Sequence, residues 1–468
     1  MAKATIDWTW QGSTRTVEVV LEVPADATPT APLVVLLHGT SGTIDDMEDP
    51  AAHPGQNHER VLPWTYRDRG WHGYPNAGFW SLGIDPLVPV TGWGPFLRSR
   101  GYPTLNWSQV APRGRLDETA AQVVSVLRAL QPAPGGALPA GLEATKGRPI
   151  ILIGHSRGGV LARQVLVTLA ATRSAVLSRI RTCVTLHAPN LGSSLANIAI
   201  AVAARATSVR DTLNSLPMPE EERRAVIGRL EDLVQGIVDE TDAPAYEDYR
   251  LGSPTLAAIS RAEPVAGVDY FTFGGTSPRL FNIRGWAFDA MSAVPQFHIP
   301  AFHWGTTYQV IMPVPPVGIP FEEVTYGAGD VLVAAARSRL PMSIHRDNPI
   351  NHAEALWDPS LQIQVESIIR SRAPLPRELV VQFVAKDSAR DADRTIDALG
   401  GVSVTGEPWH LPVADVLTLH QSGTRVFVRR KDGVLVPLQR VRRSRGGHYF
   451  RSLPGMGGPR LAELPAAP

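Results

Sequence analysis

A single serine, Ser156, stands in a pattern that is typical of an enzymatic nucleophile. It lies in the segment GHSRGG, which follows the apolar run IILI and precedes residues 158–172, where apolar side chains recur at helical spacing. Glycines on both sides permit a tight strand-to-helix turn that strains the serine backbone and lifts its hydroxyl to the top of a sheet. The start of the following helix favours negative charge. The pattern therefore predicts that Ser156 is a nucleophile.

Such a nucleophile needs an acid and a histidine, which follow it along the chain in that order. Asp330, in GAGDVLVAAARS, and His352, 22 residues later in NPINHAEAL, have this order. A buried Asp330 would fix the tautomer of His352 and stabilise its imidazolium after it accepts the proton of Ser156. Taken alone, Asp330 could be a turn or helix-cap residue and His352 an interior histidine. Asp347 and Asp358 are rival acids, but they lie so near His352 that shaping its loop is the favoured interpretation.

Two backbone amides are expected to hold the negative charge that develops on a substrate carbonyl. One is the amide of Arg157, directly after the nucleophile. The other is assigned to Thr40, in the segment LLHGTSG after an early apolar run, where Gly39 permits close approach of the backbone. His38 is interpreted as a structural residue that braces this loop. The predicted oxyanion hole thus consists of Thr40 and Arg157.

The elements that must position these residues alternate between strands and helices. A half-exposed strand is predicted at 14–23, buried strands at 32–37, 149–153, 181–186 and 268–273, and helices over 116–130 and 158–172. Buried strands joined through helices imply parallel crossovers, so we predict an α/β fold with a mainly parallel sheet flanked by helices. Cys183, the single cysteine, falls in one of these strands and is predicted to fill the core.

Three long segments interrupt this alternation, at about 42–95, 191–250 and 276–328. Insertions of this length are usually lids or binding surfaces, and the helical periodicity of 191–250 predicts a helical lid. The composition changes at the proline-containing segment 371–378, which predicts a linker. Residues 1–373 are then expected to form one large domain and residues 376–468 a small β-rich domain.

The composition of the 468 residues narrows the partners that the protein could have. The 45 basic and 44 acidic residues nearly cancel, so no nucleic-acid partner is expected. No signal peptide and no membrane-spanning apolar run is visible, which, with the single cysteine, predicts a cytoplasmic protein. Residues 424–463 carry ten basic residues against two acidic ones. This basic strip could make transient contact with a membrane surface, although solvated hairpins are the favoured alternative.

With these motifs in place, residues 30–370 resemble the α/β-hydrolase superfamily, in particular bacterial lipases and related lipid-acyl esterases. The likeness runs in order through LLHGTSG, WGPFLRSRGYPTL, GHSRGG, LHAPNLGSSL, GDVLVAAARS and NHAEAL. The resemblance implies a triad of Ser156, Asp330 and His352, with Thr40 and Arg157 as the oxyanion amides. Arg157 stands where these enzymes commonly have Met or Gln. The C-terminal tail weakly resembles a small bacterial β-domain of unknown function.

Neither a metal nor a cofactor is expected. Some bacterial lipases hold calcium beside the catalytic histidine, and Glu354 and Asp358 follow His352 at suggestive intervals. Calcium needs six or more oxygen ligands, and no acidic residue near position 310 completes such a set. The first insertion contains three histidines that lack the spacing of zinc ligands: His53, His58 and His72.

The predicted function is a cofactor-free serine carboxylester hydrolase that cleaves a small-molecule or lipid ester. Apolar and aromatic residues in the insertions favour a hydrophobic acyl chain. Acyl transfer or amidase chemistry on the same fold is the alternative, because the sequence does not show which nucleophile releases the acyl group. A non-catalytic binding protein is disfavoured, since binding alone has no use for a strained serine.

Overall fold

The chain divides into two units, Met1–Asp358 and Pro359–Pro468. The computed structural model describes most of residues 1–50, 91–194, 243–277, 322–386 and 396–466, with short gaps, and the backbone of four strands between 281 and 311. The sequence predicts a domain boundary near residue 373. In the structure the division falls before helix α12 (Pro359–Ser371), because this helix packs against α13 (Val413–Gln421) of the second unit.

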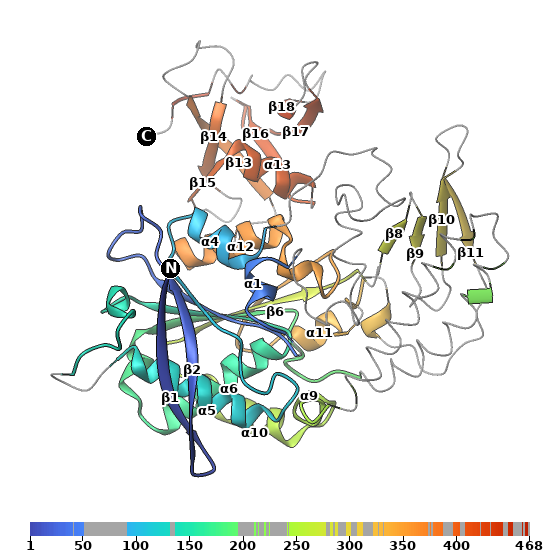
Figure 1. The fold of residues 1–468 in the computed structure, drawn as a ribbon. Helices are drawn as coiled ribbons and strands as arrows, with labels where there is room; N and C mark the ends of the chain where they lie inside the picture. The colour runs from blue at the N-terminus through green and yellow to red at the C-terminus, as the bar shows by residue number, and fades with distance from the viewer. Residues whose placement is uncertain are drawn as a thin grey trace. The chain divides into compact units, whose positions relative to one another are not determined.

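The first unit is built on an eight-stranded sheet with the order β1-β2-β4-β3-β5-β6-β7-β12 (Figure 1). The strands from β4 to β12 pair in parallel, whereas β1 and β2 pair antiparallel at one edge. The mainly parallel sheet predicted from the sequence is therefore confirmed. Its strands are β1 (Ala2–Trp10), β2 (Ser13–Glu22), β3 (Leu33–Leu37), β4 (Thr104–Asn106), β5 (Ile150–His155), β6 (Ile180–Leu186), β7 (Asp269–Gly275) and β12 (Ile344–Asn348).

Burial along the strands follows from their place in the sheet. Every residue of the central strands β3 and β5 is buried, which explains their continuous apolar sequences. The edge strand β1 alternates buried and exposed positions, because it has one covered face. Cys183 on β6 is fully buried, and burial raises the pKa of its thiol to about 12. The cysteine thus fills the core, as predicted.

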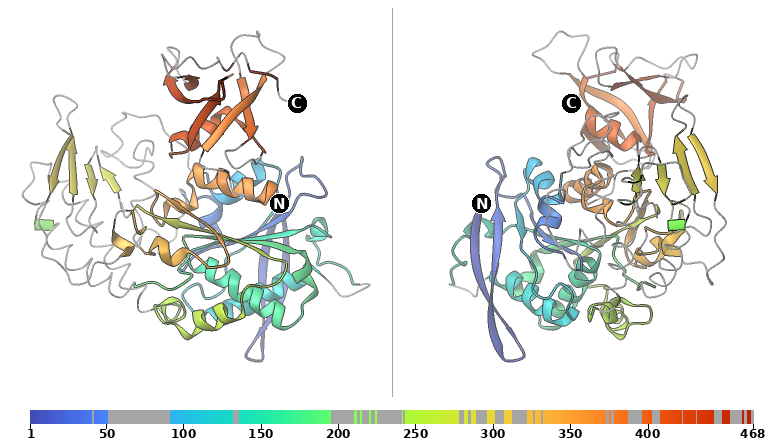
Figure 2. Two further views of the ribbon diagram at one scale, coloured as in Figure 1. Left: turned by 180° about the vertical axis from the view of Figure 1, so that it is seen from behind. Right: turned by 45° about the vertical axis from the view of Figure 1, so that its right-hand side comes forward.

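Helices cover both faces of this sheet. Figure 1 and the views of Figure 2 show α5, α6 and α10 on one face and α1 and α4 on the other. Helix α6 packs against β3, β5 and β6, which places its first turn directly behind the carboxyl end of β5. The helices and short helical turns of this unit are α1 (Asp45–Glu48), α4 (Trp93–Ser99), α5 (Leu116–Ala129), η3 (Glu143–Thr145), α6 (Arg157–Ala171), η4 (Ala175–Arg179), α9 (Tyr246–Tyr249), α10 (Pro254–Ala262), η5 (Glu322–Val324), α11 (Ala335–Ser338) and η6 (Glu354–Leu356).

The insertions are described only in part. Residues 51–90, with His53, His58 and His72, and nearly all of 195–242, where the helical lid is predicted, lie outside the described residues. The insertion at 276–328, interpreted from its length as a lid or binding surface, contributes strands. Its aromatic and β-branched segments form an antiparallel sheet of β8 (Phe281–Ile283), β9 (Trp286–Phe288), β10 (Gln296–Pro300) and β11 (Thr307–Ile311).

The second unit contains a six-stranded sheet, which confirms the predicted β-rich C-terminal region. Its order is β15-β14-β13-β16-β17-β18, and its strands are β13 (Glu378–Lys386), β14 (Ile396–Val402), β15 (Pro408–Pro412), β16 (Arg425–Arg429), β17 (Leu435–Arg442) and β18 (His448–Ser452). Part of the basic strip is paired locally: Arg425 with Glu378, Arg430 with Asp432, and Arg429 with the carbonyl of Gly433. Over the described part of both units, every helix is too short or too polar to cross a bilayer.

Candidate active site

The turn between β5 and α6 holds Ser156 in a strained conformation. Its φ of 54° and ψ of −128° lie in a region that residues other than glycine rarely adopt. A Cβ atom at Gly154 would overlap the backbone of Gly158, and one at Gly158 would overlap the carbonyl oxygens of Leu37 and His38. The glycines are therefore needed for the turn to close, and the strand-to-helix turn predicted around Ser156 is present.

The side chain of Arg157 points away from this turn. Its buried guanidinium donates hydrogen bonds to the carbonyl of Gly114, at 2.9 Å, and to Thr119 Oγ1, at 3.1 Å. Arg157 thus anchors the start of α5 with its side chain, while its backbone forms the first residue of α6 beside Ser156. The backbone amide of Arg157, predicted to be part of the oxyanion hole, therefore lies next to Ser156 whatever the side chain contacts.

The loop that contains Thr40 passes directly beside Ser156. A Cβ atom added at Gly39 would lie only 3.1 Å from the Cβ of Ser156. His38 fixes this loop: its Nε2 accepts a hydrogen bond from the Gln109 amide at 2.9 Å, so the proton resides on Nδ1, 2.9 Å from the Gly39 carbonyl. These bonds agree with the predicted bracing role of His38. Thr40 itself is half-buried at the end of this loop.

Asp330 and His352, 22 residues apart in sequence, are joined directly. Asp330 Oδ2 lies 2.9 Å from His352 Nδ1, and the amide of His352 donates to the Asp330 carbonyl, also at 2.9 Å. Both side chains are buried. Burial raises the pKa of Asp330, but the neighbouring imidazoles of His352 and His187 outweigh it, so the pKa lies well below its ordinary range. Asp330 is therefore ionised at neutral pH.

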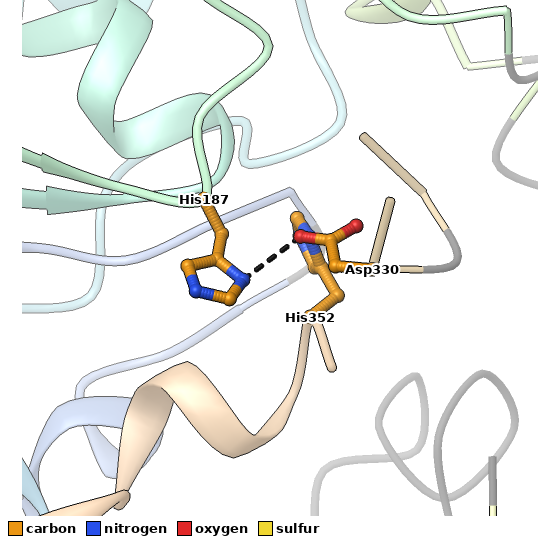
Figure 3. Close-up of side chains that lie close together, drawn as sticks. All are labelled: His187, Asp330 and His352. Carbon is orange, nitrogen blue, oxygen red and sulfur yellow. Dashed lines mark hydrogen bonds and ion pairs between the residues drawn. The ribbon is translucent and has the colours of Figure 1, made fainter. Parts of the chain in front are cut away.

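A second imidazole, which the sequence analysis did not single out, contacts the same carboxylate. His187 follows β6 directly, and its Nδ1 lies 2.8 Å from Asp330 Oδ2 (Figure 3). Its sequence position could have identified it as a candidate site residue. Like His38 and Ser156, it comes immediately after a buried parallel strand, where active-site residues gather. Three strand ends and the loop of Asp330 thus converge at one edge of the sheet.

His155, in the turn around Ser156, is hydrogen-bonded to His352. Its Nε2 donates to the carbonyl of His352 at 2.9 Å, and the two ring centroids are 4.9 Å apart. Burial, together with the nearby ring of His352, lowers the pKa of His155 well below its ordinary value, so this ring is neutral. Within the described part of the chain, no hydrogen bond runs directly from Ser156 Oγ to His352. Catalytic hydrogen bonds are often long before a substrate is bound.

The other acidic residues near His352 in sequence belong to the structure of its loop and of β12. Asp347 lies 2.8 Å from the Nε2 of His345 on β12. Glu354 accepts from the Asn351 amide at 3.0 Å while the Asn351 side chain accepts from the Glu354 amide, a reciprocal cap that shapes the histidine loop. Asp358 closes the same turn with its amide, which donates to the Glu354 carbonyl at 2.8 Å.

One group of described residues has ligand atoms close enough for a metal ion. These atoms of His187, Asp330 and His352 all lie within 4.8 Å of one another. Their separations of 2.8 and 2.9 Å from the shared carboxylate oxygen are ordinary hydrogen-bond lengths. Protons on the two Nδ1 atoms therefore account for the closeness of the three side chains.

The strand order, the parallel crossovers and the strained serine between β5 and α6 define an α/β-hydrolase fold. The sequence matches no family model and no curated protein. Among solved structures, the chain is similar to the mature lipase BlEst2 of Bacillus licheniformis, with 14% identity and a TM-score of 0.38 over 75% of this chain and 96% of that one. It is also similar to the esterase RhEst1 of Rhodococcus sp., with 14% identity and a TM-score of 0.35 over 80% of this chain and 100% of that one.

Proposed function

We propose that this protein is a serine hydrolase that cleaves carboxylic esters with Ser156, His352 and Asp330. The observation that carries the proposal is the buried hydrogen bond between Asp330 Oδ2 and His352 Nδ1. It belongs to a histidine whose backbone is held by His155, the residue immediately before the strained Ser156. An ionised carboxylate in this position fixes the tautomer of the imidazole and leaves its Nε2 free to accept a proton.

The proposed reaction uses only residues of the chain. His352 Nε2 accepts the proton of Ser156 Oγ while the oxygen attacks the ester carbonyl carbon. The amides of Thr40 and Arg157 stabilise the resulting oxyanion. The tetrahedral intermediate then collapses, and His352 donates its proton to the departing alcohol. Water, deprotonated by His352, attacks the acyl-enzyme, and Ser156 is restored when the carboxylic acid leaves.

The substrate is proposed to be a small-molecule or lipid ester with a hydrophobic acyl chain. The apolar and aromatic composition of 191–250 and 276–328 supports this choice. Transient contact of the C-terminal basic strip with a membrane surface belongs to the same proposal, and no nucleic acid is expected to bind. Acyl transfer or amide cleavage would use the same three side chains, and the nature of the second nucleophile distinguishes them.

A fluorophosphonate probe tests the nucleophile and the reaction class together. We expect the probe to label Ser156, identified by peptide mass spectrometry, and the same protein to hydrolyse p-nitrophenyl esters of graded chain length. Ser125→Ala is a matched control, because Ser125 Oγ donates to the Ala121 carbonyl within α5. Labelling at another serine, or labelling without turnover of any ester, amide or acyl acceptor, would refute the proposal.

A further inference from the structure

We infer that His187 is a positioning residue for the Asp330–His352 pair. Its hydrogen bond fixes the orientation of the Asp330 carboxylate and weakens the electrostatic interaction between this carboxylate and His352. This inference rests on the proposed function. It assigns a role to a histidine that donates to Asp330 and whose ring lies edge-on to that of His352, with centroids 6.2 Å apart.

The hydrogen bonds to Asp330 use the full capacity of its carboxylate. Oδ1 accepts from the amides of Leu332, at 3.0 Å, and Val333, at 2.7 Å. Oδ2 accepts from the Nδ1 atoms of His352 and His187. Four donors on two oxygens leave the group no freedom to rotate without breaking a bond, and such bonds to an ionised acceptor are strong. His187 supplies the fourth of these donors.

Both the backbone conformation and the surroundings of His187 are energetically unfavourable. Its φ of 51° lies in the left-handed region, which residues other than glycine adopt at an energetic cost. Its side chain is fully buried, and its Nε2 has no hydrogen-bond partner among the described residues. Strain and an unsatisfied nitrogen at one residue are typical of sites retained for function. Gly275 makes room for it, because a Cβ there would overlap His187 Cε1 and crowd the Cβ of Asp330.

The imidazoles of His187 and His352 both donate a hydrogen bond to the same oxygen of the ionised Asp330 carboxylate. The Nε2 of His187 faces no acceptor among the described residues, so Nδ1 is the ring nitrogen that donates, and it donates to Asp330. His155, which is buried and neutral, also lies beside His352, and the charge of Asp46 acts on His155. Removal of the His187 donor would leave Asp330 less solvated by hydrogen bonds. Its charge would then stabilise the His352 imidazolium more strongly.

Two substitutions separate the donor from the backbone strain. Asparagine tolerates the left-handed region and carries an N–H near the position of imidazole Nδ1, so His187→Asn preserves both features. His187→Gly tolerates the same backbone and has no donor. His345→Asn is the matched control, because His345, within β12 of the same sheet, also bonds a carboxylate, that of Asp347.

Ester hydrolysis measured from pH 5 to 9 gives the kinetic readout. For His187→Gly we expect kcat to fall by about 10- to 100-fold with KM little changed, the loss typical when a group that orients a metal-binding histidine is removed. The acidic limb of its kcat/KM profile should move to higher pH. His187→Asn should restore most of kcat and the original limb, and His345→Asn should leave both unchanged. An unmoved limb in His187→Gly, or no rescue by His187→Asn, would overturn the inference.

Histidine-selective ¹⁵N NMR titration provides a readout that does not need turnover. The imidazolium of His352, assigned by comparison with His352→Gln, should persist to higher pH in His187→Gly than in the wild-type protein and return to its original range in His187→Asn. If no ester is hydrolysed but this shift occurs, the proposed function fails while the positioning role stands. If hydrolysis is found and the titration of His352 is the same in all three proteins, only the inference about His187 fails.

Discussion

The turn around Ser156 and the cluster around Asp330 are both held rigidly, by different means. The turn is made by consecutive residues, and its shape depends on the absence of side chains at Gly154 and Gly158. The carboxylate cluster gathers residues from three distant segments, and its shape depends on hydrogen bonds to Asp330. A local steric constraint leaves a recognisable sequence pattern, whereas a hydrogen-bond network built across the fold leaves almost none.

The largest effect is expected from removal of the proposed nucleophile, Ser156. Ser156→Ala should lower ester turnover by about 10⁶-fold, because no other group in the turn can form the acyl-enzyme. The alanine keeps the small volume of the serine, so the protein should remain folded by circular dichroism. Stopped assays with p-nitrophenyl esters measure the loss, and near-normal turnover would show that the strained turn has no catalytic role.

The second-largest effect is expected from replacement of the carboxylate of Asp330. Asp330→Asn should lower kcat by about 10⁴-fold, because an amide nitrogen facing His352 favours the wrong imidazole tautomer. Asp347→Asn is the matched control, since Asp347 bonds His345 and should leave kcat close to that of the wild-type enzyme. If the losses were reversed, the acid would be Asp347 and the Asp330 cluster would have a structural function alone.

The steric basis of the turn predicts a loss of stability. In Gly158→Ala the new methyl group would overlap the backbone oxygens of Leu37 and His38, and the crowding should lower the free energy of unfolding by about 1–3 kcal/mol. Gly12→Asn is the control: Gly12 has a φ of 79° with no atom within 4 Å of an added Cβ, and asparagine tolerates such angles. Urea denaturation measures both variants. Equal stability of Gly158→Ala and the wild-type protein would contradict the steric account.

The smallest effect concerns His155, which links the two regions. Its pKa is lowered in the folded state, so below pH about 6.5 the unfolded chain binds a proton that the folded protein does not, and stability falls as the pH falls. The slope from this one group is about 1.4 kcal/mol per pH unit. His155→Gln should keep a donor for the His352 carbonyl and lose this part of the pH dependence. Denaturation at pH 8 and pH 5 checks it, and identical slopes in the two proteins would contradict the assignment.

The sequence by itself determined the central strands, helices α5 and α6, and the turn around Ser156. These features depend on neighbouring residues: continuous apolar runs for strands buried on both faces, helical spacing for the helices, and glycines that the turn requires. It also ordered Asp330 before His352. It did not indicate the short strands β4 and β8–β11, whose few residues carry too little periodicity to be distinguished from loops.

Only the tertiary structure decided which groups share the carboxylate of Asp330. His187 lies 143 residues from Asp330 in the chain, and their contact depends on the neighbouring positions of β6 and β7 in the sheet and on the space left by Gly275. The same fold turned Asp347 toward His345 and brought the backbone of His352 onto His155. Hydrogen-bond partners are chosen by proximity in space, and sequence periodicity reports only on neighbours within a few turns of helix or residues of strand.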